Sequence, residues 1–421
     1  MKYALALCFV FSLAAQDESG ELNVNARYTV ESIDFSRQRD YRLSTSLLEE
    51  IHNFIGQKLN SEKLGRLAAR IGAELHAHHV SFRVARGIAP EHVRVFLDVD
   101  DRKANFDFAI PRVSYNSRLG LSGAGEATLT AGANALTFGV LSDGETLVER
   151  STGFRAKYER LAFGESQRVR LGFEFDAFHE QYDRSTLAAL TTETGSSLGA
   201  AAYRSRRNFE PSATFVLAGP LTLTVGTSFQ QLDPDFAAAH AVSANAVNAS
   251  LRFHRHWQAS DTISQDLDAG YSLRTASRLL GSDMAYTKHT VRARYKFGFG
   301  GYHKAEATVM VGGVSSRAPL FERFVVGNST TLRGWDKYEL NPLGGNRVAH
   351  ASVTYGYRIF RVFYDAGAVW NKGEKPEPKQ SVGAGVSSGL GLFGRDAFLF
   401  ALAFPIRQGH MEPMLIAGMN F

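Results

Sequence analysis

Apolar and polar residues alternate along most of the chain, from about residue 102 to the C-terminus. Segments of about ten residues are separated by Gly, Pro, Asn, Asp or Ser. A period of two residues is that of a β-strand with one apolar face. Charged residues keep to a single face in the clearest segments, residues 169–177, 248–254, 291–299 and 304–311. The pattern therefore predicts a long series of strands.

Two architectures produce such alternation: a soluble β-sandwich with a wet outer face and a transmembrane barrel with a wet lumen. The pattern persists over about 310 residues, which favours the barrel. Residues 1–15 have the features of a secretory signal peptide, and Leu415, Ala417, Met419 and the terminal Phe421 share one face of the last strand. We predict a transmembrane antiparallel β-barrel of about sixteen strands over residues 102–421. A bilayer requires closure, because an open edge would leave unpaired backbone groups in hydrocarbon.

Residues 24–101 predict a small α+β domain instead. Residues 28–35, 80–84 and 93–99 alternate like strands, and two amphipathic helices are predicted between the first two of these segments. The expected apolar faces are Leu47, Leu48, Ile51 and Ile55 in the first helix, and Leu64, Leu67, Ala68 and Ile71 in the second. The order β-α-α-β-β, the size and the position ahead of a barrel resemble a POTRA domain, the periplasmic module of outer-membrane assembly proteins.

A long loop, residues 316–346, interrupts the predicted strands. Loops of this length are uncommon unless they are functional or disordered, and disordered segments are poor in aromatic and branched apolar residues. This loop is rich in them, at Phe321, Phe324, Val325, Val326, Leu332, Trp335 and Leu343. We therefore expect it to pack against other parts of the protein.

The centre of the loop carries Arg333 beside Gly334. A guanidinium next to a backbone-permissive glycine can aim a fixed cation at one partner. In the strand predicted at residues 362–370, the alternation directs Asp365 and Gly367 into the lumen. We predict that Arg333 pairs with Asp365, and that Gly367 leaves room for the loop to approach the wall.

These motifs resemble those of the BamA and TamA superfamily of outer-membrane assembly barrels, which also includes the two-partner secretion transporters. In that superfamily the sixth extracellular loop folds into the lumen, and its (V/I/L)-R-G-(F/Y/W) tip pairs with the Asp of an F-x-D-x-G strand. The resemblance implies an anchor made of Arg333, Gly334, Trp335, Asp365 and Gly367. It also implies loop support from Glu322, Arg323, Phe324, Gly344 and Gly345, and a C-terminal barrel signature at Met419 and Phe421. Only one POTRA-like module fits ahead of the barrel here, whereas BamA-like members carry several.

Composition and motifs argue against nucleic-acid binding, thiol chemistry, metal binding and catalysis. The 421 residues carry a net charge of +5 with scattered basic positions, which does not favour nucleic-acid binding by an exported protein. Cys8 is the only cysteine and lies in the predicted signal, so no thiol chemistry is expected. His76, His78 and His79 cluster near Glu74, but at a predicted turn where exposed polar residues are common, so we expect no metal site. Without a nucleotide-binding or hydrolase motif, we expect no cofactor and no enzymatic activity.

Three functions remain open. The resemblance implies a protein of the bacterial outer membrane whose POTRA-like domain lies in the periplasm. It would act as an assembly factor that inserts barrel proteins, as a two-partner-type secretion pore, or as a passive structural barrel. The expected partners are unfolded outer-membrane or secreted polypeptides and the lipid bilayer, with periplasmic chaperones or accessory lipoproteins as further candidates. Pro413 and Gly418 either weaken the seam between the last and first strands or are only a strand start and a packing glycine.

Overall fold

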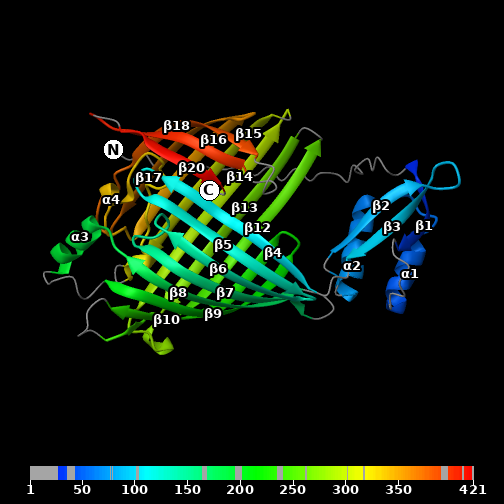
Figure 1. Cartoon of the computed structure of the whole chain (residues 1–421), viewed down its shortest axis with the longest axis horizontal. Coiled ribbons are helices and arrows are strands. Elements are labelled where there is room, and N and C mark those ends of the chain that lie inside the picture. The colour runs from blue at the N-terminus through cyan, green and yellow to red at the C-terminus, as the bar shows by residue number, and fades with distance from the viewer. Residues whose placement is uncertain are drawn as a thin grey trace, which may run out of the picture. The chain divides into compact units, whose positions relative to one another are not determined.

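The structure is a computed structural model that describes residues 27–35, 43–75, 77, 79–100, 104–163, 168–194, 202–234, 240–260, 263–300, 302–315, 318–389, 397–409 and 412–419. The predicted signal peptide and Phe421 lie outside these residues. The chain divides into two compact units, Met1–Asn105 and Phe106–Phe421, which are described separately (Figure 1).

The smaller unit has the predicted order β-α-α-β-β. Its elements are β1 (Thr29–Phe35), α1 (Thr45–Phe54), α2 (Ser61–Glu74), β2 (His79–Arg86) and β3 (His92–Asp100). The sheet order is β1-β3-β2, with β1 parallel and β2 antiparallel to the central β3. This arrangement confirms the small α+β, POTRA-like domain.

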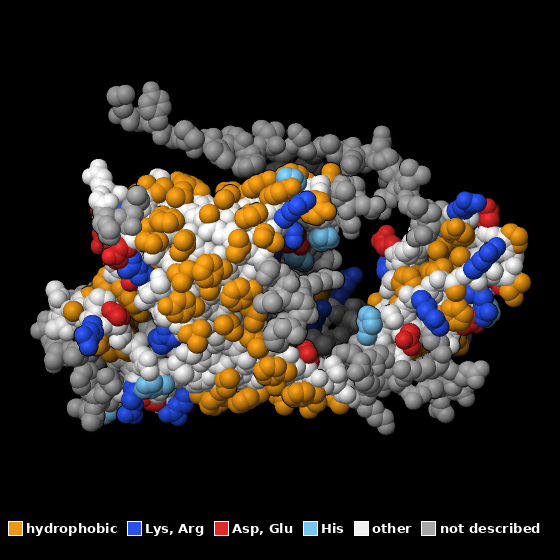
Figure 2. Space-filling model, turned by 45° about the horizontal axis from the view of Figure 1, so that its top comes forward, with side chains coloured by type: hydrophobic (Ala, Val, Ile, Leu, Met, Phe, Trp, Pro, Cys, Tyr) orange, Lys and Arg blue, Asp and Glu red, His pale blue; other side chains and the backbone are white. Residues whose placement is uncertain are grey.

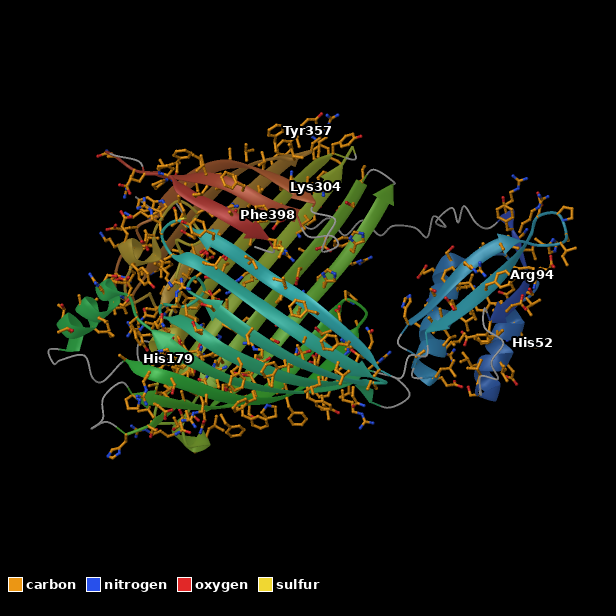
Figure 3. All side chains as sticks on the ribbon, in the orientation of Figure 1. His52, Arg94, His179, Lys304, Tyr357 and Phe398 are labelled. Atoms are coloured by element: carbon orange, nitrogen blue, oxygen red, sulfur yellow. The ribbon has the colours of Figure 1, made fainter. Side chains whose placement is uncertain are left out.

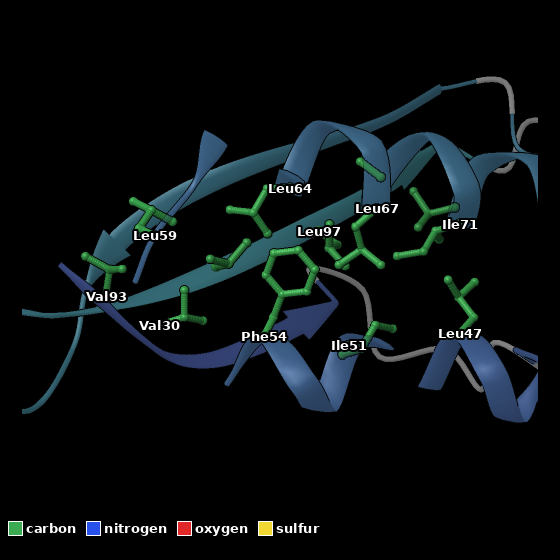
Figure 4. Close-up of a cluster of buried hydrophobic side chains, with 13 residues drawn as sticks. Val30, Leu47, Ile51, Phe54, Leu59, Leu64, Leu67, Ile71, Val93 and Leu97 are labelled. Carbon is green, nitrogen blue, oxygen red and sulfur yellow. The ribbon is translucent and has the colours of Figure 1, made fainter. Parts of the chain in front are cut away.

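The two helices of the smaller unit supply much of its core (Figure 4). In α2 the four predicted core residues are all buried, and the side chain of Asn60 caps the N-terminus by accepting from the next turn. In α1 the prediction was partly wrong, because Leu48 and Ile55 are 46% and 42% exposed. The buried face is instead Leu47, Ile51 and Phe54, which recur at the i, i+4 and i+7 spacing of one narrow helical stripe.

The larger unit is a closed antiparallel barrel of sixteen long strands, as predicted. They are β4 (Asn105–Asn116), β5 (Gly120–Ala131), β6 (Asn134–Asp143), β7 (Arg150–Phe163), β8 (Val169–Gln181), β9 (Tyr203–Ala218), β10 (Leu221–Pro234), β12 (Ala246–Ser260), β13 (Ile263–Ala276), β14 (Tyr286–Phe299), β15 (His303–Val314), β16 (Arg347–Tyr357), β17 (Phe360–Trp370), β18 (Lys379–Gly389), β19 (Ala397–Ile406) and β20 (Met414–Met419). A two-residue strand, β11 (Val242–Ser243), lies in the connection between β10 and β12.

The two faces of the barrel wall differ as the alternation predicted. Large apolar side chains are exposed on the outside, among them Phe138, Phe154 and Phe173, and they cover much of the face seen in Figure 2. Charged residues meet inside, as in the pair between Arg155 and Asp176 at 2.8 Å. No helix in the described part of the chain is long and apolar enough to cross a membrane.

The two ends of the barrel also differ. At one end the connections are mostly short, as at residues 132–133, 219–220 and 358–359. At the other they are mostly long and include α3 (Arg184–Thr194) and α4 (Lys337–Leu340) (Figure 1). We call these the short-turn end and the long-loop end. The asymmetry is typical of outer-membrane barrels, which have short periplasmic turns and longer extracellular loops.

The barrel closes through a short seam between β20 and β4. Among the described residues, which end at 419, four pairs join these strands, from Ile416 with Asn116 to Met419 with Val113, whereas thirteen join β13 and β14. Pro413 precedes β20, which favours the strand-start interpretation of this residue. Gly418 lies within the strand, opposite Ser114.

Two arginine substitutions in β6 test which face of the strand contacts lipid. Phe138 is exposed on the outer face, and the adjacent Thr137 faces the lumen, where its hydroxyl bonds Thr128. Phe138→Arg should lower the free energy of unfolding in vesicles by about 2–4 kcal/mol near the bilayer midplane. Thr137→Arg is the control at the same depth and should cost clearly less. Equal losses would contradict the assignment of the two faces.

The smaller unit should fold alone, because its thirteen buried apolar residues pack against one another. Circular dichroism of a fragment of residues 24–105 should show mixed helix and strand with a cooperative thermal transition. A featureless spectrum would remove the POTRA-like assignment as an independent domain.

Candidate functional site

The long loop lies between β15 and β16, the eleventh and twelfth long strands of the barrel. Its described part, residues 318–346, contains a 3-10 turn, Leu320–Glu322, and the single-turn helix α4. Most of its apolar side chains are buried: Leu320, Phe321, Phe324, Val325, Val326, Leu332 and Trp335. The loop thus packs against the protein.

Arg333 and Asp365 meet inside the barrel through three hydrogen bonds. The guanidinium of Arg333 donates from Nε to Oδ2 of Asp365 at 2.8 Å and from Nη2 to Oδ1 at 2.7 Å. The backbone N–H of Arg333 also donates to Oδ2, at 2.9 Å. The geometry is the bidentate fork that gives the strongest charge-assisted contacts.

The pair is shielded from water. Asp365 is 0% and Arg333 9% exposed. Ser352 donates to Oδ1 of Asp365 at 2.7 Å and accepts from Arg333 at 2.9 Å, and the guanidinium lies 3.6 Å from the ring centroid of Phe363. Desolvated charges are favourable only with such additional partners, because burial alone is costly.

The two residues beside Arg333, Leu332 and Gly334, both have positive φ angles. Gly334 has φ +99°, and a Cβ there would lie 3.1–3.2 Å from the backbone of β19. Leu332 has φ +46°, which is strained for a branched side chain. Its N–H donates to Nε2 of His350 at 3.2 Å, and its side chain is fully buried. Tertiary contacts therefore hold the tip of the loop in place.

Trp335 and Gly367 have distinct places at the anchor. The indole N–H of Trp335 donates to the carbonyl of Gln380 in β18 at 2.8 Å. At Gly367 an added Cβ would lie 3.3 Å from Cδ2 of His350. The nearest side chain at Gly367 therefore belongs to the adjacent strand, and that side chain holds the N–H of Leu332.

Glu322 forms a second buried anchor of the loop. Its carboxylate pairs with Arg274 of β13 at 2.7 Å and Lys288 of β14 at 3.1 Å, and accepts from Tyr286 at 3.0 Å. Burial acts to raise the pKa of Glu322, but Lys288 and Arg274 outweigh it and hold the pKa below its ordinary value.

The other predicted support residues join the two ends of the loop. Phe324 and Gly345 exchange two backbone hydrogen bonds, at 2.8 and 2.9 Å. A Cβ at Gly345 would lie 2.8 Å from backbone atoms of Trp370, and one at Gly344, where φ is +64°, 2.9 Å from the carbonyl oxygen of Phe324. Arg323 makes a long contact, 3.5 Å, with the carbonyl of Leu343.

Lys337, which is 1% exposed, was not predicted from the sequence. Its ammonium donates to the carbonyls of Gly144, Leu147 and Val148 in the connection between β6 and β7. Burial lowers its pKa to about 8. Backbone carbonyls leave no trace in a sequence, so these partners could not have been found from it.

Two further contacts, which were not predicted from the sequence, connect the loop to the two strands of the seam, β4 and β20. Ser329 donates to Glu145 at 2.7 Å and accepts from Asn116 of β4 at 3.3 Å. At the second strand of the seam, the N–H of Gly334 donates to the sulfur of Met414 in β20 at 3.4 Å. The only local signal was the polar run 328–331, in which Asn328 accepts from the N–H groups of the two threonines.

Of the C-terminal signature, Met419 pairs with Val113 across the seam, and Phe421 lies outside the described residues. His76 and His78 also lie outside them. Among the residues that the structure describes, no group of three or more His, Cys, Asp or Glu is placed to hold a metal ion.

Comparisons with known proteins agree with this architecture. Residues 145–411, more than half of the chain, match the model of the Omp85 superfamily domain. BamA from Haemophilus ducreyi lacking POTRA domains 1–3 has a similar fold, with a TM-score of 0.61 at 15% identity over 93% of this chain and 84% of that one. CdiB from Escherichia coli has a TM-score of 0.55 at 11% identity over 94% of this chain and 76% of its own. A comparison with curated protein sequences found no significant match.

Breaking the buried pair should release the loop. Arg333→Ala or Asp365→Ala leaves one buried charge without its partner, at a cost of about 3–5 kcal/mol. The cost cannot exceed the free energy at which the loop leaves the lumen and the charge returns to water. Each variant should increase the rate of proteolysis within residues 318–346. The double variant should be little worse than either single one, and Arg333→Lys should rescue only in part, because it lacks the planar fork. Additive effects of the two single variants would contradict the pairing.

The Glu322 anchor should weaken in acid. Because its folded pKa is depressed, ionised Glu322 contributes stability that is present above its unfolded pKa of about 4.3 and lost as the pH falls through the folded value. Protection of the wild-type loop from an acid-active protease should therefore fall below about pH 4. Glu322→Gln should be less protected at neutral pH and should lack this acid-dependent component. Parallel pH profiles for the two proteins would exclude Glu322 as the titrating anchor.

Proposed function

The chain belongs to the Omp85 superfamily, and from this membership we propose that it inserts barrel proteins into the bacterial outer membrane. The short seam is the observation that carries the proposal. Among the described residues, four pairs hold β20 to β4, and residues 105–112 of β4 have no partner on the described part of β20. An unpaired strand edge is a template for an incoming strand.

The smaller unit supports the same function. Its sheet order leaves β1 and β2 at the edges, and an exposed edge can bind an extended polypeptide by strand addition. We place this unit in the periplasm, where it would receive unfolded barrel proteins. Periplasmic chaperones and accessory lipoproteins are the further partners of this proposal.

In this function the loop acts as an internal brace. It is fixed to β17 by Arg333 and to β13 and β14 by Glu322. It also touches both seam strands, through Ser329 and Gly334. We propose that these contacts hold the other strands of the wall in place while the seam between β20 and β4 opens for a client.

A secretion pore of the two-partner type is the second candidate. The observation in its favour is that the loop is anchored inside the lumen by the pair of Arg333 and Asp365. Movement of the loop would then open a path for a polypeptide through the barrel. Both functions share the barrel and differ in where the client passes, through the seam or through the lumen.

A disulfide across the seam separates the two functions. Tyr115 and Ala417 are directly paired, so Tyr115→Cys with Ala417→Cys should lock the seam after oxidation. In proteoliposomes the oxidised protein should lose insertion of a client barrel, scored by protease protection, and reductant should restore it. The matched control is Thr128→Cys with Thr137→Cys, across β5 and β6, which should insert clients equally well in both redox states.

Undiminished insertion by the locked protein would contradict the seam route. Export of a polypeptide with ion conductance, unaffected by the lock, would instead support the secretion pore. Failure of the reduced protein in both assays would leave the passive barrel as the function.

A further inference from the structure

A cluster of aromatic and basic residues lies at the short-turn end of β14 to β16. We call it the Arg358 cluster, and it consists of Phe299, Tyr302, His303, Tyr355, Tyr357 and Arg358. The guanidinium of Arg358 lies 5.1 Å from the ring centroid of Tyr302 and 5.6 Å from that of Tyr357. His303 stacks on Phe299 at 4.8 Å and bonds the hydroxyl of Tyr355 at 2.6 Å. These contacts form one connected group.

The cluster belongs to the outer surface of the barrel. Tyr355 and Tyr357 alternate with the buried Ser352 and Gly356 and are exposed, as is Tyr302 at 58%. Figure 3 labels Tyr357 at this end of the barrel. Aromatic side chains at the ends of barrel strands lie at the level of the lipid headgroups.

The charge of Arg358 has no carboxylate partner among the described residues. The turn that carries it, Tyr357 to Arg361, contains no acidic residue. Arg207 is an informative contrast, because it also faces outward but is paired with Asp233 at 2.7 Å. An exposed guanidinium without a carboxylate, at the boundary between hydrocarbon and water, is suited to a lipid phosphate, whose oxygens match its planar fork.

The position of Arg358 is fixed by the fold. Its φ of +51° is unusual for a residue other than glycine, and its N–H donates to the carbonyl of Tyr302 at 3.0 Å. The two tyrosine rings hold the side chain by cation–π contact. Arg358 therefore presents its charge from a set position.

We propose that the Arg358 cluster binds the phosphate of an anionic phospholipid in the leaflet at the short-turn end. The exposed Val353 and Val362, on the same outer face, offer a continuous apolar surface for the acyl chains. This continuity selects a lipid over an acidic segment of a polypeptide, which would not extend into hydrocarbon.

Native mass spectrometry of the full-length protein in detergent tests the proposal. After delipidation, the protein should retain phosphatidylglycerol in preference to phosphatidylethanolamine with the same acyl chains. Arg358→Asn keeps a residue that tolerates positive φ and should reduce this preference about fivefold, the ratio expected for about 1 kcal/mol per basic residue at an anionic surface. Arg207→Asn is the matched control and should leave the preference unchanged.

A second variant guards against misfolding of the first. Tyr302→Leu removes one stacking ring but keeps the backbone carbonyl that holds Arg358, and it should also reduce the preference. Faster migration of unheated samples on gels verifies that each barrel is folded. An unchanged preference in folded Arg358→Asn, or equal loss in Arg207→Asn, would overturn the proposal. Full competition by glycerol phosphate at an equal concentration would indicate a free-phosphate site, and competition by an acidic peptide a polypeptide site, and either would overturn the lipid assignment.

Discussion

The position of the loop inside the barrel depends on how well two buried charges compensate each other once they have left water. Arg333 and Asp365 satisfy this condition through a bidentate contact, a third bond from the backbone and the hydroxyl of Ser352. A mispositioned loop would leave one charge buried without a partner, which costs several kcal/mol. The pair thus selects one position of the loop, and the glycine beside it permits the close approach to β19 that this position requires.

This single position allows distant strands to be braced together. Glu322 binds β13 and β14, Trp335 binds β18, and Lys337 binds the connection between β6 and β7. The strands that the loop joins are separated around the wall, so their relative positions no longer depend only on the ladder of neighbouring hydrogen bonds. Such bracing matters most at the seam, where the described part of the ladder has four pairs.

The outside of the barrel obeys a different constraint. Its apolar side chains face hydrocarbon, so charge is confined to the ends of the strands, where aromatic rings accompany it. Inside, charges meet opposite charges, as Arg155 meets Asp176. Arg358 follows the outer arrangement, since it lies at a strand end beside Tyr302 and Tyr357. It has no carboxylate partner among the described residues, and we therefore seek its partner in the bilayer.

The local features of this protein follow from its amino-acid sequence. Alternation identified the strands and their faces, because the direction of a side chain on a strand depends only on its position along the backbone. The motif at residues 332–335 and the inward position of Asp365 pointed to the contact between Arg333 and Asp365, because each residue type offers the other a matched charge. In α1 the same reasoning gave the right helix but too wide an apolar face, since only the stripe through Leu47, Ile51 and Phe54 is buried.

Which distant groups meet, in contrast, depends on the folded barrel. Lys337 binds carbonyl groups, which every residue carries, so nothing in the sequence distinguishes its partners. The contact of Ser329 with Asn116 joins residues 213 positions apart, and the pairing of β20 with β4 depends on the strand register at closure. At Gly367, His350 of the adjacent strand is the nearest side chain. Such contacts depend on how the closed wall aligns its strands, and a local pattern carries no information about that alignment.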